Sequence, residues 1–153
     1  MRRALLPALI LVLSACSRMG GGGPRAQAST ETVTVTPEAV MNAALLTLQE
    51  DGWTVNRLAD GTLATSPRAL PAAAQTEATK DQQWMVQVAA APMFRLAGTQ
   101  VSVAGFVIPA IANQPPDSVL VTRAVPITDR NPTLWPEVRS LTSRIVRATK
   151  TKR

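Results

Sequence analysis

The sequence predicts an α+β domain, in which an antiparallel sheet of about four to six strands carries two helices on one face. Two apolar stripes with helical spacing lie in residues 37–51 and 134–148. Between them, several short segments alternate apolar and polar residues, which is typical of half-buried strands. Strands that run together between two helices favour a two-layer arrangement, with the order strand, helix, strands, helix.

The first two elements are a strand and a helix. Residues 30–35 alternate threonine and valine, which predicts a strand. Thr36 is a candidate N-cap, Pro37 suits the first helical position, and Gly52 is a stop signal. The helix is therefore expected over residues 37–51. Its apolar positions recur at helical spacing: Val40, Met41, Ala44, Leu45 and Leu48.

The middle of the chain is expected to supply the rest of the sheet. A turn at Ala59-Asp60-Gly61 separates two short alternating segments, which predicts a hairpin. The region after it, residues 66–81, contains two prolines and an alanine-rich polar run, and is expected to be a long loop. Alternation predicts strands at residues 53–58, 62–65, 82–90, 99–107 and 118–122.

A second helix is expected at the C-terminal end. Asp129-Arg130-Asn131-Pro132 reads as a turn or cap, and the helix should run from Leu134 or Pro136 to Ala148. One stripe of this helix is apolar, and arginines occupy its other faces. The apolar stripe comprises Leu134, Val138, Leu141, Ile145 and Ala148.

The N-terminal residues predict an export signal that ends at a lipidated cysteine. Met1-Arg2-Arg3 is a short positive segment, and residues 4–13 form an apolar run too short to span a bilayer. Leu13-Ser14-Ala15-Cys16 follows, and all four positions resemble the lipobox of bacterial lipoproteins. The resemblance implies diacylglycerol on the Cys16 thiol, cleavage before Cys16, and acylation of the new amino group, commonly with palmitate. The competing interpretation is a secreted protein with an incidental cysteine.

These signals divide the chain into four parts. Residues 1–15 are the expected signal peptide, residues 16–29 a lipidated cysteine with a glycine-rich flexible tether, residues 30–149 a single domain, and residues 150–153 a basic tail. Ser17 follows the cysteine, as in lipoproteins sorted to the outer membrane. The resemblance therefore implies a chain anchored in the bacterial cell envelope, at the outer membrane, with its domain facing the periplasm.

One segment of the mature chain resembles another family. Leu-Gln-Glu-Asp-Gly-Trp-Thr-Val at residues 48–55 joins the end of the first helix to a strand through a glycine, an aromatic residue and a valine. This resembles the small α+β modules of outer-membrane assembly lipoproteins, in which an early and a late helix bracket a sheet. That family carries two such modules, whereas this chain has one.

The residue inventory argues against an enzyme. The chain has no histidine, and its single cysteine is the expected lipidation site, so the commonest base and metal ligands are missing. Glu50-Asp51 is the only adjacent acidic pair, and its place at a helix end favours a solvated turn. We therefore expect no catalytic residues, cofactor or metal. A further check is whether any two of four carboxylates converge in a cleft: Asp60, Asp81, Asp117 and Asp129.

The positive charge of the chain, +6 in total, is mostly dispersed. Isolated arginines usually form a solvated face, and an exported chain without a basic stripe is not expected to bind nucleic acid. A basic cluster occurs only at residues 139–153. It would suit anionic lipid headgroups or an acidic partner, and it would equally follow from the preference of cations for the negative end of a helix dipole. The isolated arginines are Arg18, Arg25, Arg57, Arg68, Arg95, Arg123 and Arg130.

Aromatic residues are the remaining candidates for a contact site. Trp84, Phe106 and Trp135 are the candidate positions, although packing is the favoured role for Trp84 and for Trp53, which sit in alternating segments. The leading functional expectation is a non-enzymatic scaffold or accessory lipoprotein that binds another envelope protein. The alternative is a module that binds a lipid or other apolar ligand, in a pocket lined by Trp84, Phe106 and Val103.

Overall fold

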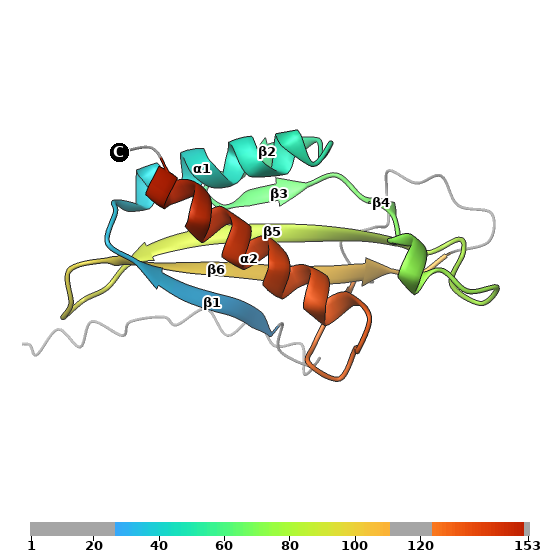
Figure 1. Cartoon of the computed structure of the whole chain (residues 1–153). Helices are drawn as coiled ribbons and strands as arrows, with labels where there is room; N and C mark the ends of the chain where they lie inside the picture. Colours follow the sequence, from blue (N-terminus) through green and yellow to red (C-terminus); the bar gives the residue numbers. More distant parts are fainter. Residues whose placement is uncertain (1–26, 111–123, 152–153) are drawn as a thin grey trace, which may run out of the picture.

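The computed structural model of the chain describes residues 27–110 and 124–151. In these residues a seven-stranded antiparallel sheet and two helices follow the expected order of strand, helix, strands, helix, which confirms the α+β class (Figure 1). The strand count exceeds four to six because two strands, β4 (Arg68–Ala69) and β7 (Val125–Pro126), contain two residues each. Strands this short show no alternation in sequence.

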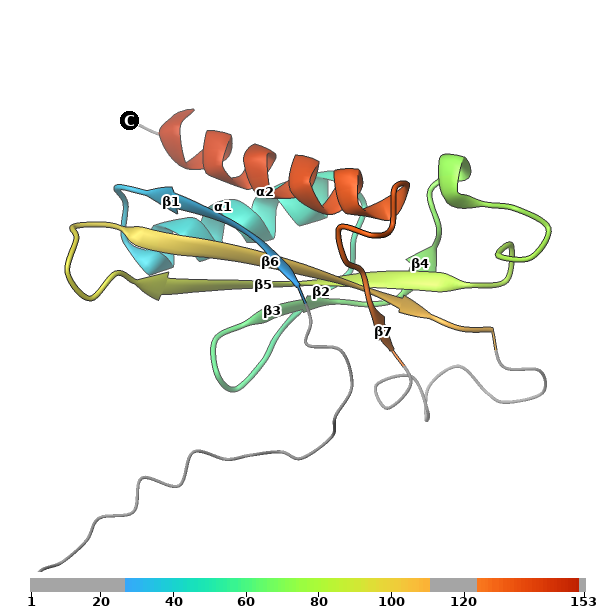
Figure 2. The ribbon, with the colours of Figure 1, turned by 90° about the horizontal axis from the view of Figure 1, so that it is seen from below.

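Two long strands form the centre of the sheet. β5 (Gln83–Pro92) and β6 (Thr99–Ile108) pair along their full length as one hairpin. β3 and β4 lie end to end along the outer edge of β5, and β1 and β7 lie end to end along the outer edge of β6 (Figure 2). The order is β1-β6-β5-β3-β2, with β1 at Ala28–Val33, β2 at Val55–Arg57 and β3 at Leu63–Thr65.

The first helix, α1 (Pro37–Glu50), begins and ends at its sequence signals. The Thr36 side-chain oxygen accepts a hydrogen bond from the Ala39 N–H at 3.3 Å, which satisfies one of the unpaired donors of the first turn. Gly52 has a φ of +80°, a conformation that glycine adopts without steric cost. The expected apolar stripe is buried, except that Leu45 is only partly covered.

The second helix, α2 (Leu134–Thr151), is capped by Asn131. Its Oδ1 accepts hydrogen bonds from the N–H groups of Thr133, at 3.2 Å, and Leu134, at 2.9 Å. The helix continues past the expected end at Ala148 because Thr149 is also buried against the domain. Among the described residues, neither helix combines the length and the apolar character that a membrane span requires.

The core lies between the helices and one face of the sheet. Val86, Val88, Val101 and Val103 are fully buried there and belong to one apolar cluster with the stripes of both helices. Gly105 allows α2 to approach β6 closely. A Cβ atom at this position would lie 2.7 Å from Cγ2 of Val138 and 2.8 Å from Cδ1 of Ile127.

Several boundaries differ from expectation. β1 begins at Ala28 and ends at Val33, rather than covering residues 30–35, because backbone pairing with residues 99–104 decides its extent. The expected loop at residues 66–81 contains β4 and a short 3-10 helix, Ala72–Ala74. The expected strand at residues 118–122, the signal peptide, Cys16 and most of the tether lie outside the described residues.

Candidate functional site

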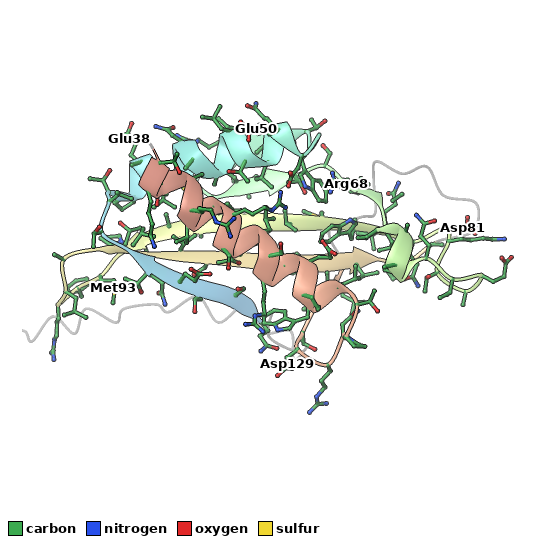
Figure 3. The ribbon with its side chains drawn as sticks, in the orientation of Figure 1. Glu38, Glu50, Arg68, Asp81, Met93 and Asp129 are labelled. Atoms are coloured by element: carbon green, nitrogen blue, oxygen red, sulfur yellow. The ribbon has the colours of Figure 1, made fainter. Side chains whose placement is uncertain are left out.

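An open hollow of about 300 Å³ lies where the end of α1, β4 and the first half of α2 meet. We call it the Trp–Arg hollow. Arg68 sits near the C-terminal end of α1 (Figure 3), and two tryptophans form the apolar part of the wall. The lining residues are Asp51, Trp53, Arg68, Ala69, Pro71, Trp84, Glu137, Leu141 and Arg144.

Arg68 is held flat against an aromatic wall. Its Cζ atom lies 3.4 Å from the centroid of the Trp53 ring and 5.8 Å from that of Trp84. The two indole rings meet edge to face, with centroids 5.1 Å apart and an interplanar angle of 66°. A guanidinium over an indole face is attracted by the ring quadrupole, so the tryptophans fix the plane in which Arg68 presents its donors.

The end of α1 supplies the polar partners of the hollow. Nη1 of Arg68 donates a hydrogen bond to the backbone oxygen of Asp51 at 2.9 Å. Nη1 of Arg144, on α2, donates to the Oδ1 atom of Asp51 at 2.6 Å. Asp51 therefore joins both arginines, with its backbone oxygen at one and its carboxylate at the other.

Burial shapes the electrostatics of the hollow. Burial lowers the pKa of Arg68 from its ordinary value, the charge of Asp51 raises it, and the nearby Arg144 lowers it again. Glu137 has a smaller raising effect. The lining thus carries two cations and two carboxylates, and its formal charge is balanced. The guanidinium of Arg68 is the group in it that can still bind a carboxylate, because only one of its N–H donors is used among the described residues.

Trp84 contributes an unused hydrogen-bond donor. Its side chain lines the hollow and is 3% exposed, and its Nε1 atom has no hydrogen-bond partner among the described residues. Buried indole N–H groups usually donate a hydrogen bond, so Nε1 of Trp84 is a donor that a bound partner could use.

The structure does not bring the three candidate aromatic residues together. Trp84 lies on the helix side of β5, in phase with Val86 and Val88, and Trp135 packs at the start of α2 against the same core. Phe106 pairs with Met85, so its side chain lies on the opposite face of the sheet. Trp84 and Phe106 therefore line different surfaces, and the hollow beside Trp84 is not lined by Phe106 or Val103.

Arg68 is the site residue that the sequence did not reveal. The sequence predicts Arg68 in a long loop, as one of several dispersed cations on a solvated face, and that prediction is wrong for this residue. Its pairing with Trp84 in the β4–β5 ladder places it on the same face as the indole rings. The sequence offers only a weak signal for this position. Leu70, two residues after the arginine, is apolar, and the structure buries it.

The structure does not bring together the described members of the four carboxylates singled out in the sequence. Asp81 and Asp129 lie in different connections, far apart in Figure 3. Asp60 lies in the β2–β3 turn and, with Glu38, lines a second open hollow of about 290 Å³. The fourth candidate, Asp117, is outside the described residues. In residues 27–110 and 124–151, no three His, Cys, Asp or Glu side chains are grouped so that they could hold a metal ion.

Comparison with known proteins adds no family assignment. No protein-family model matches the sequence, and no curated protein matches it either.

Proposed function

We propose that this chain is a lipid-anchored lipoprotein of the bacterial cell envelope whose single α+β domain binds another envelope protein without catalysing a reaction. The lipobox at Leu13-Ser14-Ala15-Cys16 supports the anchor, and Ser17 supports the outer membrane with the domain in the periplasm. The absence of histidine from the sequence supports a binding role over a catalytic one.

The observation that carries the proposal is the Trp–Arg hollow. A guanidinium has five N–H donors, and among the described residues Arg68 uses one, in its bond to the Asp51 backbone oxygen. The two indoles, which meet edge to face, hold the remaining donors in a fixed plane beside Arg144. Tryptophan and arginine are the residues that most often dominate binding at protein interfaces.

This chemistry specifies the partner. A carboxylate from an Asp or Glu side chain, or from a chain terminus, would accept hydrogen bonds from Arg68 and Arg144. The apolar part of the same partner segment would cover Ala69 and Pro71, which remain accessible in the lining. We therefore expect an acidic and apolar loop or terminus of an envelope protein to insert into the Trp–Arg hollow.

The alternative, a module for an apolar ligand, has less support. Such a module requires space between sheet and helices, and there Val86, Val88, Val101 and Val103 are fully buried in one apolar cluster. The wall of the Trp–Arg hollow is open and carries charges, which suits an acidic segment better than an acyl chain.

The test is site-specific crosslinking in cells with the full chain. A photo-crosslinking residue replaces Ala69, an exposed member of the hollow, and in a matched control it replaces Asn42, an exposed residue of α1. We expect one envelope protein to crosslink from position 69 and not from position 42. Arg144→Gln should weaken this crosslink, and Cys16→Ser should abolish membrane attachment. If position 69 captures only lipid or a small molecule, the adaptor proposal falls and the carrier alternative replaces it.

A further inference from the structure

The β5–β6 hairpin is nearly free of charge except at its turn. From residue 82 to residue 116 the sequence contains one charged side chain, Arg95, and no carboxylate. Arg95 lies in the turn that joins the two central strands, between Phe94 and Leu96. A cation and two large apolar residues are thus concentrated at one end of the sheet.

The base of the β5–β6 turn is fixed by a hydrogen bond and by close packing on β1, and the turn extends beyond the rest of the sheet. The Met93 N–H donates a hydrogen bond to the Gly98 oxygen at 3.0 Å, which closes the turn and leaves residues 94–97 beyond it. Gly98 has a φ of +151° and packs so closely on β1 that a Cβ atom would lie 2.8 Å from the Val33 oxygen. Both ribbon views show the turn extending past the ends of α2 and β1 (Figures 1 and 2), and Met93 marks its base in Figure 3.

Two large apolar side chains of this turn are exposed to solvent. Phe94 is fully exposed and Leu96 is 67% exposed, whereas four valines of the same two strands are buried in the core: Val86, Val88, Val101 and Val103. Contiguous apolar residues that remain in water mark contact sites with proteins or membranes. We call residues 93–98 the apolar tip.

We propose that the apolar tip docks on the phospholipid surface to which Cys16 anchors the chain, an inference that rests on the anchor in the proposed function. Phe94 and Leu96 enter the boundary between headgroups and acyl chains, and the Arg95 guanidinium binds anionic headgroups. The absence of carboxylates from the hairpin removes the repulsion that an anionic surface would otherwise exert. The domain then has two contacts with the membrane, the lipid and the tip.

The tether is long enough for both contacts. The eleven residues 16–26 reach at most roughly 36–40 Å when extended. Ala28, where β1 begins, pairs with Ala104, and the tip lies farther along β6 beyond Thr99. At about 3.4 Å per residue, this stretch of β6 measures roughly 17 Å, and the projecting turn adds roughly 10 Å, which is still less than the reach of the tether. The lipid can therefore stay in the membrane while the tip touches it.

A membrane suits the apolar tip better than a protein does. A stable protein interface buries about 800 Å² on each partner, or roughly 20–30 residues. The tip is a single turn of residues 93–98 at a narrow end of the sheet, with Phe94 and Leu96 as its exposed apolar residues. Shallow insertion of a few apolar side chains beside a cation is sufficient for a membrane contact when a lipid already holds the chain.

The test uses the full lipidated chain reconstituted into phosphatidylcholine vesicles that contain a minority of phosphatidylglycerol. Phe94→Trp places a reporter in the tip, and Leu46→Trp places one at an exposed apolar position of α1. With acyl chains brominated near the headgroup, we expect added quenching and a shift to shorter wavelength for Phe94→Trp, but not for Leu46→Trp. Arg95→Gln in the Phe94→Trp chain should lower the docked-to-undocked ratio about fivefold on these vesicles, since a cation at an anionic surface contributes about 1 kcal/mol.

The outcomes are separable. If the chain floats with the vesicles but the two tryptophans are quenched equally, the anchor stands and the tip proposal fails. If the chain does not float, the anchor of the proposed function fails, and the tip proposal fails with it. If a photo-crosslinker at residue 94 captures a protein in cells while quenching is absent, the tip is part of a protein interface, and the membrane proposal is overturned.

Discussion

Gly105→Ala tests the close approach of α2 to β6. The new methyl group would lie 2.7 Å from Cγ2 of Val138 and 2.8 Å from Cδ1 of Ile127, well inside the 3.4 Å at which ordinary contact begins. Cδ1 is the far end of a flexible side chain and can move. Val138 is β-branched and sits in a helix, where one rotamer dominates, so it cannot turn away. Overpacking of this kind costs about 1–3 kcal/mol of the free energy of unfolding.

Val138→Ala completes a double-mutant cycle for this contact. On its own it removes fully buried methyl groups and should cost roughly 1–3 kcal/mol. In the double variant the methyl group of residue 105 occupies part of the vacated space. We therefore expect the combined loss to be smaller than the sum of the single losses by at least about 1 kcal/mol.

Urea unfolding measures these effects through the buried indoles of Trp53 and Trp84, whose rings are in contact. The midpoint should fall for Gly105→Ala with the slope unchanged, because the surface exposed on unfolding is the same. A Gly105→Ala chain as stable as the parent, with strictly additive losses in the double variant, would refute the reasoning that α2 presses on β6 at this point.

Three further perturbations can be measured by the same assay. Arg68→Lys keeps the charge but removes the planar contact with the indole ring, so it should cost about 1 kcal/mol, whereas the exposed control Arg139→Lys should stay within about 0.5 kcal/mol. Asn131→Ala removes the cap of α2 and should cost about 0.5–2 kcal/mol, while Asn131→Asp should retain most of it. The Thr62 N–H lowers the pKa of Asp60 below 3.8, so ionised Asp60 stabilises the fold above that pH, and the stabilisation is lost as the pH falls through the lowered pKa. In the Asp60→Asn variant, the free energy of unfolding should therefore fall less steeply as the pH is lowered.

Each of these has a contrary result. Equal losses for the lysine variants of the two arginines would show that the stacked guanidinium contributes nothing specific. An unchanged midpoint for Asn131→Ala would place the capping of α2 elsewhere. If the free energy of unfolding falls equally with pH in the Asp60→Asn variant and the parent, the turn hydrogen bond does not couple the titration of Asp60 to folding.

The helices and the two long strands were predictable because their pattern is local. The stripes of α1 and α2 repeat at helical spacing, and Thr36, Pro37 and Gly52 mark ends by backbone chemistry that acts within a few residues. The alternation in residues 83–92 and 99–108 reports burial on one face. These signals need no knowledge of what lies across the sheet.

The candidate site was less predictable because it depends on register. The face that Phe106 occupies was available from sequence, since it falls out of phase with Val101 and Val103, and the structure places it opposite the core. Arg68 gave no comparable signal. Its place over Trp53 depends on the two-residue pairing of β4 with β5, and no periodicity can be read from two residues.

The pairing of β1 with β6 has a consequence for how the chain folds as it is synthesised. Residues 28–33 find their partners at residues 99–104, so β1 makes contacts of high sequence separation, which are slow to form. Because a chain is made from its N-terminus, β1 emerges first and waits without a partner. Its sequence, Ala-Ser-Thr-Glu-Thr-Val, is polar and carries a charge, so the waiting segment is a poor seed for aggregation. The apolar strands β5 and β6 adjoin in sequence, so each has a partner almost as soon as it emerges.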